Sequence, residues 1–164
     1  MSGIAAAPEI ALISESVENA NARIRFFRIA FGAASQGSSV PTREVHDILG
    51  DMSRGGRLSY RWDVRGPLER DRVKLAFLLL QCLESALPFG GEIVVKGGEA
   101  AWTISGRAER RKVDPELWAL LIDPGIDATL SPADVHFALV ADAARSANRT
   151  VTTDLGDDEI RIVC

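Results

Sequence analysis

The chain has 164 residues, of which 46% are hydrophobic and 26% are charged, and its formal net charge is −4. This length accommodates one ordinary domain, or a small domain that carries a helical extension. The balance of apolar and charged residues is typical of a globular protein. The acidic net charge argues against nucleic-acid binding through bulk electrostatics.

The cysteine count and the hydropathy pattern indicate the cellular compartment of the protein. Two cysteines, Cys82 and Cys164, are too few for a disulfide framework and indicate a reducing cytoplasm. Residues 1–7 lack the basic start of a signal peptide, and the segment after them contains several glutamates. The longest apolar run, residues 75–80, is far shorter than the roughly 20 residues that span a bilayer. We therefore predict a cytoplasmic protein with no membrane partner.

A long amphipathic helix is predicted near the start of the chain, from Pro8 to the glycine-containing linker at residues 35–39. Apolar residues recur there at alternating steps of three and four, which places them on one seam of the helix. These residues are Ile10, Ile13, Val17, Ala20, Ile24, Phe27 and Phe31. A helix of about 25 residues is too long to be buried in one small domain, so the seam predicts partner helices and a homodimer. The alternative is a long surface helix that packs on its own domain.

The remaining elements alternate between helical and strand patterns. Thr42 caps a short helix that Gly50 is expected to end, and Asp114 with Pro115 opens a later helix. Double glycine at residues 97–98 predicts a hairpin. We predict helices at 42–49, 70–87, 114–121 and 133–147, and strands at 58–64, 92–96, 100–106, 150–154 and 159–163. This order predicts an α+β fold with helices on one face of a mixed sheet.

Two stretches carry a family resemblance: ENANARIRFFRIAFGAAS at residues 18–35 and LESALPFGGEI at residues 83–93. Both closely resemble the ChpT-type histidine phosphotransferases of alphaproteobacterial cell-cycle phosphorelays. The resemblance implies the plan of a sensor histidine kinase, in which a helical dimerisation hairpin precedes an ATPase-like α/β sandwich, here degenerate. On this plan residues 1–36 are the second helix of the hairpin and residues 41–164 are the ATPase-like domain. The likeness is only topological over residues 107–164.

The same resemblance indicates that ATP chemistry has been lost. A kinase's central helix resembles NLLxNAxKYTPxGGxI, and alignment on Pro88, Gly90 and Gly91 places Cys82 where the Asn that holds Mg²⁺ should stand. A thiol is a poor ligand for Mg²⁺, which prefers oxygen. Leu78 replaces the first Asn, and a DxGxG-type loop is missing. We therefore expect no ATP-dependent kinase activity, no cofactor and no metal site.

The family's phosphoacceptor histidine lies on the first hairpin helix, within a pattern like HDLxSPxGAI. Residues 1–7 resemble the turn after that helix, so we expect this chain to lack the acceptor. Three explanations stay open: a start codon placed too late, a fragment of the protein, or a family member that has lost its acceptor. Without the acceptor the chain is expected to be inactive as given.

Two histidines remain, and neither matches the motif well. His46 precedes Asp47 as in the pattern, but Asp51 stands where the motif has Pro, and the helix is expected to end at Gly50. His46 is therefore only a weak candidate for the catalytic residue. His136 is expected to be a partly covered packing residue.

The polar flank of the first helix is the candidate partner-binding surface. The resemblance implies that a receiver domain docks beside the hairpin, and arginine is enriched at interface hot spots. We assign Asn19, Arg23, Phe26 and Arg28 to this surface, although a solvated flank is the plain alternative. Phe26 lies just off the seam, so it is either covered by the α/β domain or presented to a partner.

The resemblance implies a protein that relays phosphoryl groups from a hybrid histidine kinase to response-regulator receiver domains, from Asp to His to Asp. The alternative is a non-catalytic module that binds a receiver or a kinase of such a pathway. A third reading, an unrelated anti-sigma or stress kinase-like domain, is weakened by Cys82 and by the missing glycine loop. The basic run at residues 107–112 is expected to be solvated. Trp62, Trp102 and Trp118 are expected in the core or on a face of the sheet.

Overall fold

The computed structural model describes residues 7–33 and 37–164. The expected turn at residues 1–7 therefore lies, apart from Ala7, outside the described residues, as does part of the expected linker at 35–39. The elements run in the order α1 (Pro8–Ala30), α2 (Thr42–Ser53), β1 (Leu58–Val64), α3 (Arg70–Ala86), β2 (Gly91–Gly97), β3 (Trp102–Arg107), α4 (Pro115–Ala119), a 3-10 turn (Pro132–Asp134), α5 (Val135–Ser146), β4 (Thr152–Leu155) and β5 (Ile160–Val163). Among the described helices, none is long and apolar enough to cross a membrane.

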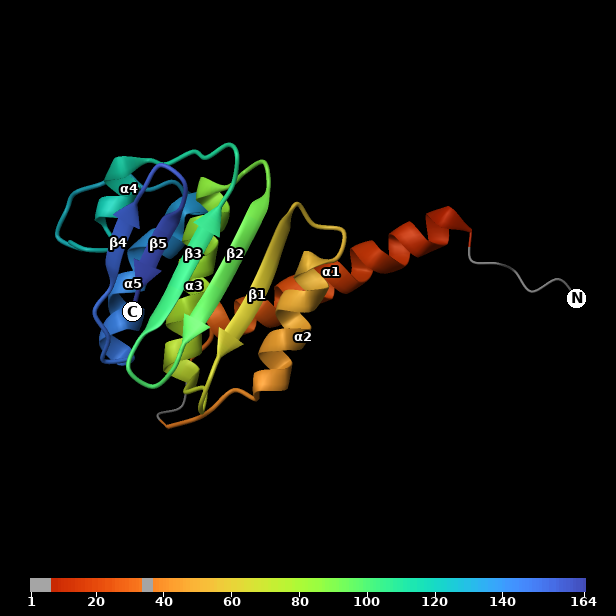
Figure 1. The fold of residues 1–164 in the computed structure, drawn as a ribbon, viewed down its shortest axis with the longest axis horizontal. Coiled ribbons are helices and arrows are strands. Elements are labelled where there is room, and N and C mark those ends of the chain that lie inside the picture. The colour runs from red at the N-terminus through yellow and green to blue at the C-terminus, as the bar shows by residue number, and fades with distance from the viewer. Residues whose placement is uncertain (1–6, 34–36) are drawn as a thin grey trace, which may run out of the picture.

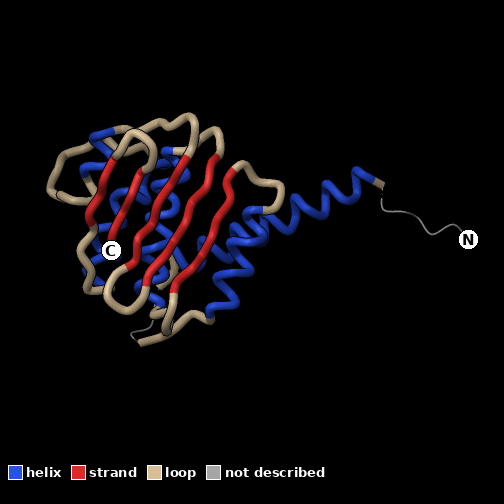
Figure 2. The backbone as a smooth tube through the Cα atoms, in the orientation of Figure 1, coloured by secondary structure: helices blue, strands red, loops and turns tan. Residues whose placement is uncertain are grey.

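The five strands form one mixed sheet in the order β1-β2-β3-β5-β4. Strands β1 and β2 are parallel because helix α3 connects them as a crossover, and the other neighbours are antiparallel. Figures 1 and 2 show α3 and α5 behind one face of the sheet, while the other face is open. The predicted α+β fold with a mixed sheet is confirmed.

The core lies between the sheet and α3. Strand alternation aligns four buried side chains in one row across the sheet: Trp62, Val95, Ile104 and Ile162. Helix α3 packs on this row and has eleven buried residues. The prediction that all three tryptophans lie in the core or on a face of the sheet is confirmed, because Trp62, Trp102 and Trp118 are all buried.

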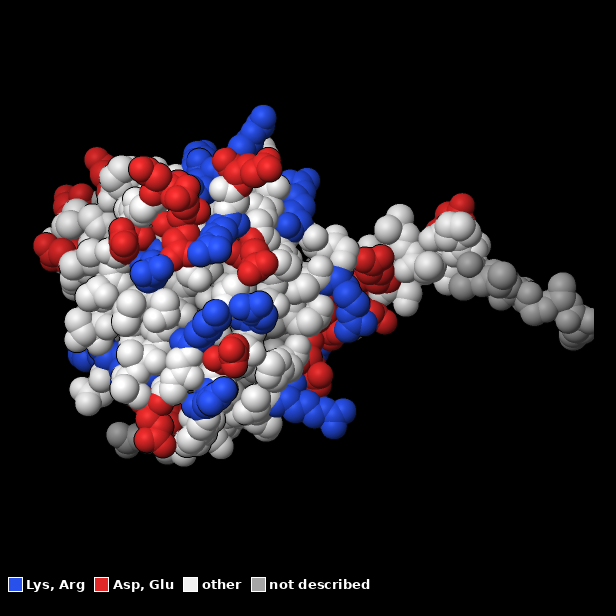
Figure 3. Space-filling view, in the orientation of Figure 1, with Lys and Arg blue, Asp and Glu red and all other residues white. Residues whose placement is uncertain are grey.

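The open face of the sheet is polar, and charges of both signs are spread over it (Figure 3). Glu159 accepts hydrogen bonds from Arg107, at 2.8 Å, and from Arg161. These bonds lower the pKa of Glu159. The cations on this face are therefore partly balanced within the chain. Arg107 belongs to the basic run expected to be solvated, and its side chain is exposed.

Helix α1 joins the body over its C-terminal part only, and its N-terminal part projects away (Figure 1). The Phe26 ring stacks on Phe77 of α3, with centroids 4.4 Å apart and an interplanar angle of 6°. Phe26 has no exposed surface, and Ala22, Ile29 and Ala30 beside it are buried. The α/β domain therefore covers Phe26, and its assignment to the partner-binding surface was wrong.

The prediction that helix α2 ends at Gly50 is wrong, because the helix continues to Ser53. Val45, Leu49 and Met52 are buried on one face of this helix. Burial of Met52 in the last turn outweighs the cost of about 1 kcal/mol for a glycine inside a helix. The helix end was therefore set by tertiary packing rather than by the local glycine signal.

Helix α5 packs on α3 through a buried histidine. His136 is 6% exposed, and its Nε2 atom lies 3.0 Å from the Oγ atom of Ser85. The His136 ring also lies 4.8 Å from the ring of Phe137, centroid to centroid. Burial lowers the pKa of His136, against the opposing effect of Asp134 and Glu84. The histidine is a packing residue, more fully covered than we expected.

The substitution Phe26→Ala is predicted to lower the free energy of unfolding by about 3–5 kcal/mol, because it opens a cavity against Phe77. Phe27→Ala is the matched control, since that adjacent ring is 39% exposed and its loss should cost within about 0.5 kcal/mol. Urea unfolding of both variants at low protein concentration measures the difference. Equal effects at the two positions would contradict the described attachment of α1.

Stability is predicted to fall as the pH drops through the ordinary histidine pKa of about 6.5. The pKa of His136 is lower in the folded chain, so the unfolded chain binds the proton first and the free energy of unfolding decreases. The variant His136→Gln should lose the part of the pH dependence of the free energy of unfolding that His136 contributes between about pH 7.5 and about pH 5.5. His46→Gln, at an exposed position, is the control and should keep it. Urea unfolding at several pH values measures both; an unchanged slope in His136→Gln would refute the prediction.

Candidate functional site

The seam on α1 is exposed along its whole length. Ile13 is 62% exposed, Ile24 is 51% and Phe27 is 39%. All seven predicted seam residues are exposed: Ile10, Ile13, Val17, Ala20, Ile24, Phe27 and Phe31. At about 100° per residue they lie on roughly the opposite side of the helix from the buried residues Phe26 and Ile29. The helix therefore presents one apolar face to the body and a second apolar face to solvent.

A polar cluster fixes α1 to the body beside this seam. The Nη1 atom of Arg23 lies 2.9 Å from both carboxylate oxygens of Glu84 on α3. The hydroxyl of Tyr60, on β1, donates a hydrogen bond to the same carboxylate. Burial and the Glu84 charge raise the pKa of Tyr60, so its hydroxyl stays protonated and remains a donor. Arg23, predicted to bind a partner, is thus paired within the chain.

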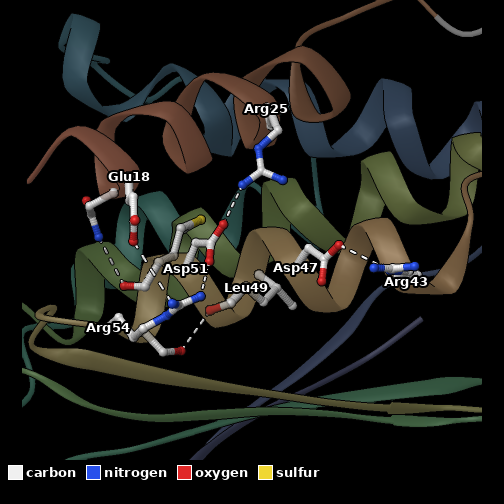
Figure 4. Close-up of polar contacts among 10 residues, drawn as sticks. Glu18, Arg25, Arg43, Asp47, Leu49, Asp51 and Arg54 are labelled. Atoms are coloured by element: carbon white, nitrogen blue, oxygen red, sulfur yellow. Dashed lines mark hydrogen bonds and ion pairs between the residues drawn. The ribbon is translucent and has the colours of Figure 1, made fainter. Parts of the chain in front are cut away.

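A second cluster joins α1 to α2 (Figure 4). Asp51 on α2 points toward α1, and its Oδ2 atom lies 2.6 Å from the Nη2 atom of Arg25. Its other oxygen accepts a hydrogen bond from Arg54. Arg54 reaches back to Glu18 on α1, with 4.0 Å between the charged atoms. Asp51, which replaces the motif proline after His46, therefore helps to hold α1 on α2.

The two remaining candidates on the polar flank differ in their surroundings. The Nδ2 atom of Asn19 donates to the backbone oxygen of Met52, at 3.3 Å. Arg28 is exposed and borders a surface hollow of about 490 Å³ between α1 and α2. The hollow is lined by Glu18, Asn21, Ile24, Arg25, Arg28 and Asp51. Of the predicted partner-binding residues, Arg28 is the one both exposed and beside a concave surface.

The two histidines and the nucleotide positions are not among the residues that line this hollow. His46 is exposed on α2, and one of the two arguments against it fails because its helix continues past Gly50. Cys82 is fully buried in α3, and burial raises the pKa of its thiol well above the ordinary value. Within residues 7–33 and 37–164, no three His, Cys, Asp or Glu side chains are grouped so as to hold a metal ion.

Sequence reasoning missed the intramolecular partners of the arginines. Glu84 and Tyr60 are polar residues at inward positions of a largely apolar helix and strand, and that contrast was the available signal. The signal at Asp51 was weaker, because its position in the sequence shows only a departure from the histidine motif and not a contact with α1. The arrangement leaves an exposed apolar face and a hollow on α1, and these polar contacts attach the helix to the α/β body.

Comparison with known proteins places the chain in a family. Residues 42–159, most of the chain, match the model of the histidine phosphotransferase C-terminal domain. The protein phosphotransferase ChpT of Brucella abortus (strain 2308) is 36% identical over 89 residues, which are 53% of this chain and 43% of that protein. The match thus spans less than half the length of this curated relative.

Solved structures agree on the fold. A bacterial phosphotransferase structure superposes with a TM-score of 0.78 at 24% identity, covering 94% of this chain and 77% of that one. The catalytic domain of histidine kinase ThkA gives a TM-score of 0.52 at 12% identity, covering 74% of this chain and 86% of that one. The body therefore has the fold of a histidine-kinase ATPase domain. From the family match, the sequence identity and the fold, this chain belongs to the histidine phosphotransferase family, as a protein of the ChpT type.

Proposed function

We propose that this chain is the helix-plus-body part of a cytoplasmic phosphorelay protein that passes phosphoryl groups from Asp to His to Asp. Its partners are the receiver domain of a hybrid histidine kinase and the receiver domains of response regulators. Family membership supports this role, and the ChpT likeness adds to it. The observation that carries the proposal is the exposed apolar seam of α1, which is built to receive another helix.

In this role the chain has two parts with different functions. Residues 1–36 are the second helix of a dimerisation hairpin, and residues 41–164 are a degenerate ATPase-like domain. A phosphoacceptor histidine would lie on a helix that covers the seam, so that the receiver docks beside Arg28 and the hollow next to it. The protein then contributes position and electrostatic support, while the aspartyl phosphate supplies the reactive group. ATP, metal and cofactor are not part of this scheme.

A second candidate function is a module that binds a receiver or a kinase without accepting a phosphoryl group. The placement of the two histidines favours it: His136 is buried between α3 and α5, and His46 lies on α2 rather than on α1. Such a module would use the same α1 surface to compete for receivers.

Phosphotransfer distinguishes these functions. We predict that a phosphorylated receiver domain labels a version of the chain extended upstream by its in-frame codons, and leaves the chain as given unlabelled. Acid-labile phosphate on each protein is the measurement. If the given chain is labelled and His46→Ala abolishes the label, the acceptor is His46 and the proposed placement on a covering helix is refuted. If neither version is labelled but both bind the receiver, the non-catalytic module is the better description.

We also predict that the chain self-associates through the seam. The double variant Ile13→Glu with Ile24→Glu should weaken association by at least ~tenfold, because it places charges in an apolar contact. Leu12→Glu is the matched control, since Leu12 is 65% exposed on the same helix but off the seam. Sedimentation velocity at tens of micromolar reports the oligomeric state. A wild-type chain that sediments as a clean monomer there would count against the homodimer.

A further inference from the structure

An exposed aromatic residue stands at the turn between α3 and β2, away from the α1 seam. Phe89 is 68% exposed, the largest exposed fraction among the large hydrophobic residues of the described chain. Single exposed apolar residues are common and need no explanation by themselves. The surroundings of Phe89 set it apart, because they combine a hydrogen-bonded backbone turn with an arginine beside the ring.

The backbone that carries Phe89 is held tightly. Gly90 has φ +103°, and a Cβ atom there would lie 2.6 Å from the carbonyl oxygen of Arg57, so this turn requires glycine. The Gly90 amide donates to the oxygen of Leu87 at 3.1 Å, and the Gly91 amide donates to the oxygen of Arg57 at 3.2 Å. Leu87 is buried in the core on one side of the turn. The backbone that carries the ring is therefore ordered before a partner docks, which reduces the backbone entropy lost on binding.

One cationic side chain lies against the ring, and a second arginine borders the turn through its backbone. The guanidinium of Arg110 lies 5.7 Å from the centroid of Phe89, a cation–π arrangement. Arg57, the residue before β1, packs its carbonyl group and Cβ atom against Gly90, and its side chain is exposed. Neither arginine forms an ion pair within the described part of the chain. A hollow of about 460 Å³ lies against the ring and includes one carboxylate, that of Glu109.

We propose that Phe89, Arg57 and Arg110 form a second docking point for a receiver domain, at an apolar pocket of that domain with acidic residues on its rim. Aromatic residues and arginine are the side chains that dominate interface hot spots. The two unpaired arginines supply complementary charge on a chain whose net charge is −4. The inference rests on the proposed relay function, because it takes the partner from that function.

The distances allow one partner to touch both docking points. Glu84, which binds Arg23 of α1, precedes Phe89 by five residues. Five residues span at most about 18 Å even when fully extended. A small domain is about 30 Å across. Arg28, beside which the receiver is proposed to dock, lies five residues from Arg23, a further rise of about 8 Å along α1. A receiver beside Arg28 is therefore within reach of the Phe89 turn.

The test is binding of purified receiver domains from the source genome to the chain, by isothermal titration calorimetry. Starting from a receiver that binds the wild type, Phe89→Ala should raise Kd at least ~tenfold. The double variant Arg57→Ser with Arg110→Ser should also weaken binding, and its Kd should depend less on salt. Ile122→Ala, at a residue 60% exposed, and Arg43→Ser on α2 are controls that should leave Kd unchanged.

The outcomes separate the inference from the function on which it rests. Wild-type binding with unchanged Kd in both the Phe89 and the arginine variants overturns the second docking point and leaves the relay function intact. If no receiver domain binds the wild type, the proposed function itself fails and the docking point fails with it. A thermal unfolding midpoint within error of the wild type confirms that each variant is folded, as the exposure of Phe89 leads us to expect.

Discussion

Helix α1 meets the α/β body over its C-terminal part, where the stacked rings of Phe26 and Phe77 and the pairing of Arg23 with Glu84 join it to α3. The ring stack supplies apolar burial, which holds the helix on the body without fixing its direction. The ion pair and the Tyr60 hydroxyl add directional contacts at one point on the helix. Everything that the N-terminal part of α1 presents to solvent depends on this attachment.

The attachment divides α1 into surfaces with different roles. On the flank beside the buried face, Arg23 pairs with Glu84 and Arg25 pairs with Asp51. These two arginines therefore orient the helix and are not free to bind a ligand. Because taking charges out of water costs free energy, a partly buried ion pair need not add net stability. The seam on the far side has no such partners and retains its apolar character. A helix held rigidly at one end can therefore offer a long, straight binding surface at the other.

Periodicity predicted most of the fold. The helix predicted from the apolar seam, the strand predicted at residues 58–64 and the helix predicted at residues 70–87 lie within a few residues of the observed α1, β1 and α3. The end of α2 could not be read locally, because burial of Met52 overrides the glycine signal. The family resemblance, carried by two short stretches, supplied the architecture that periodicity alone left open.

The candidate site was predicted less well, and the reason is physical. Spacing along a helix shows which residues share a face, but not which side chain on another element they meet. Sequence alone left open whether Phe26 is covered and could not show that Arg23 has an internal partner. Their contacts, Phe77 and Glu84, lie more than fifty residues away in the chain. Phe89 lies within the quoted family stretch, yet its exposure depends on how Gly90 packs against Arg57.

The position of Cys82 explains why the surfaces of interest gather where they do. In the alignment with kinases this residue takes the place of a metal-binding asparagine, and here it is sealed in the core with a neutral thiol. The middle of α3 is buried against the sheet and α1, while its C-terminal end reaches the surface: Glu84 pairs with Arg23 of α1, and the turn after Ala86 presents Phe89. The last turn of α3 therefore links the two surfaces for which we propose partner binding, the α1 helix and the Phe89 turn.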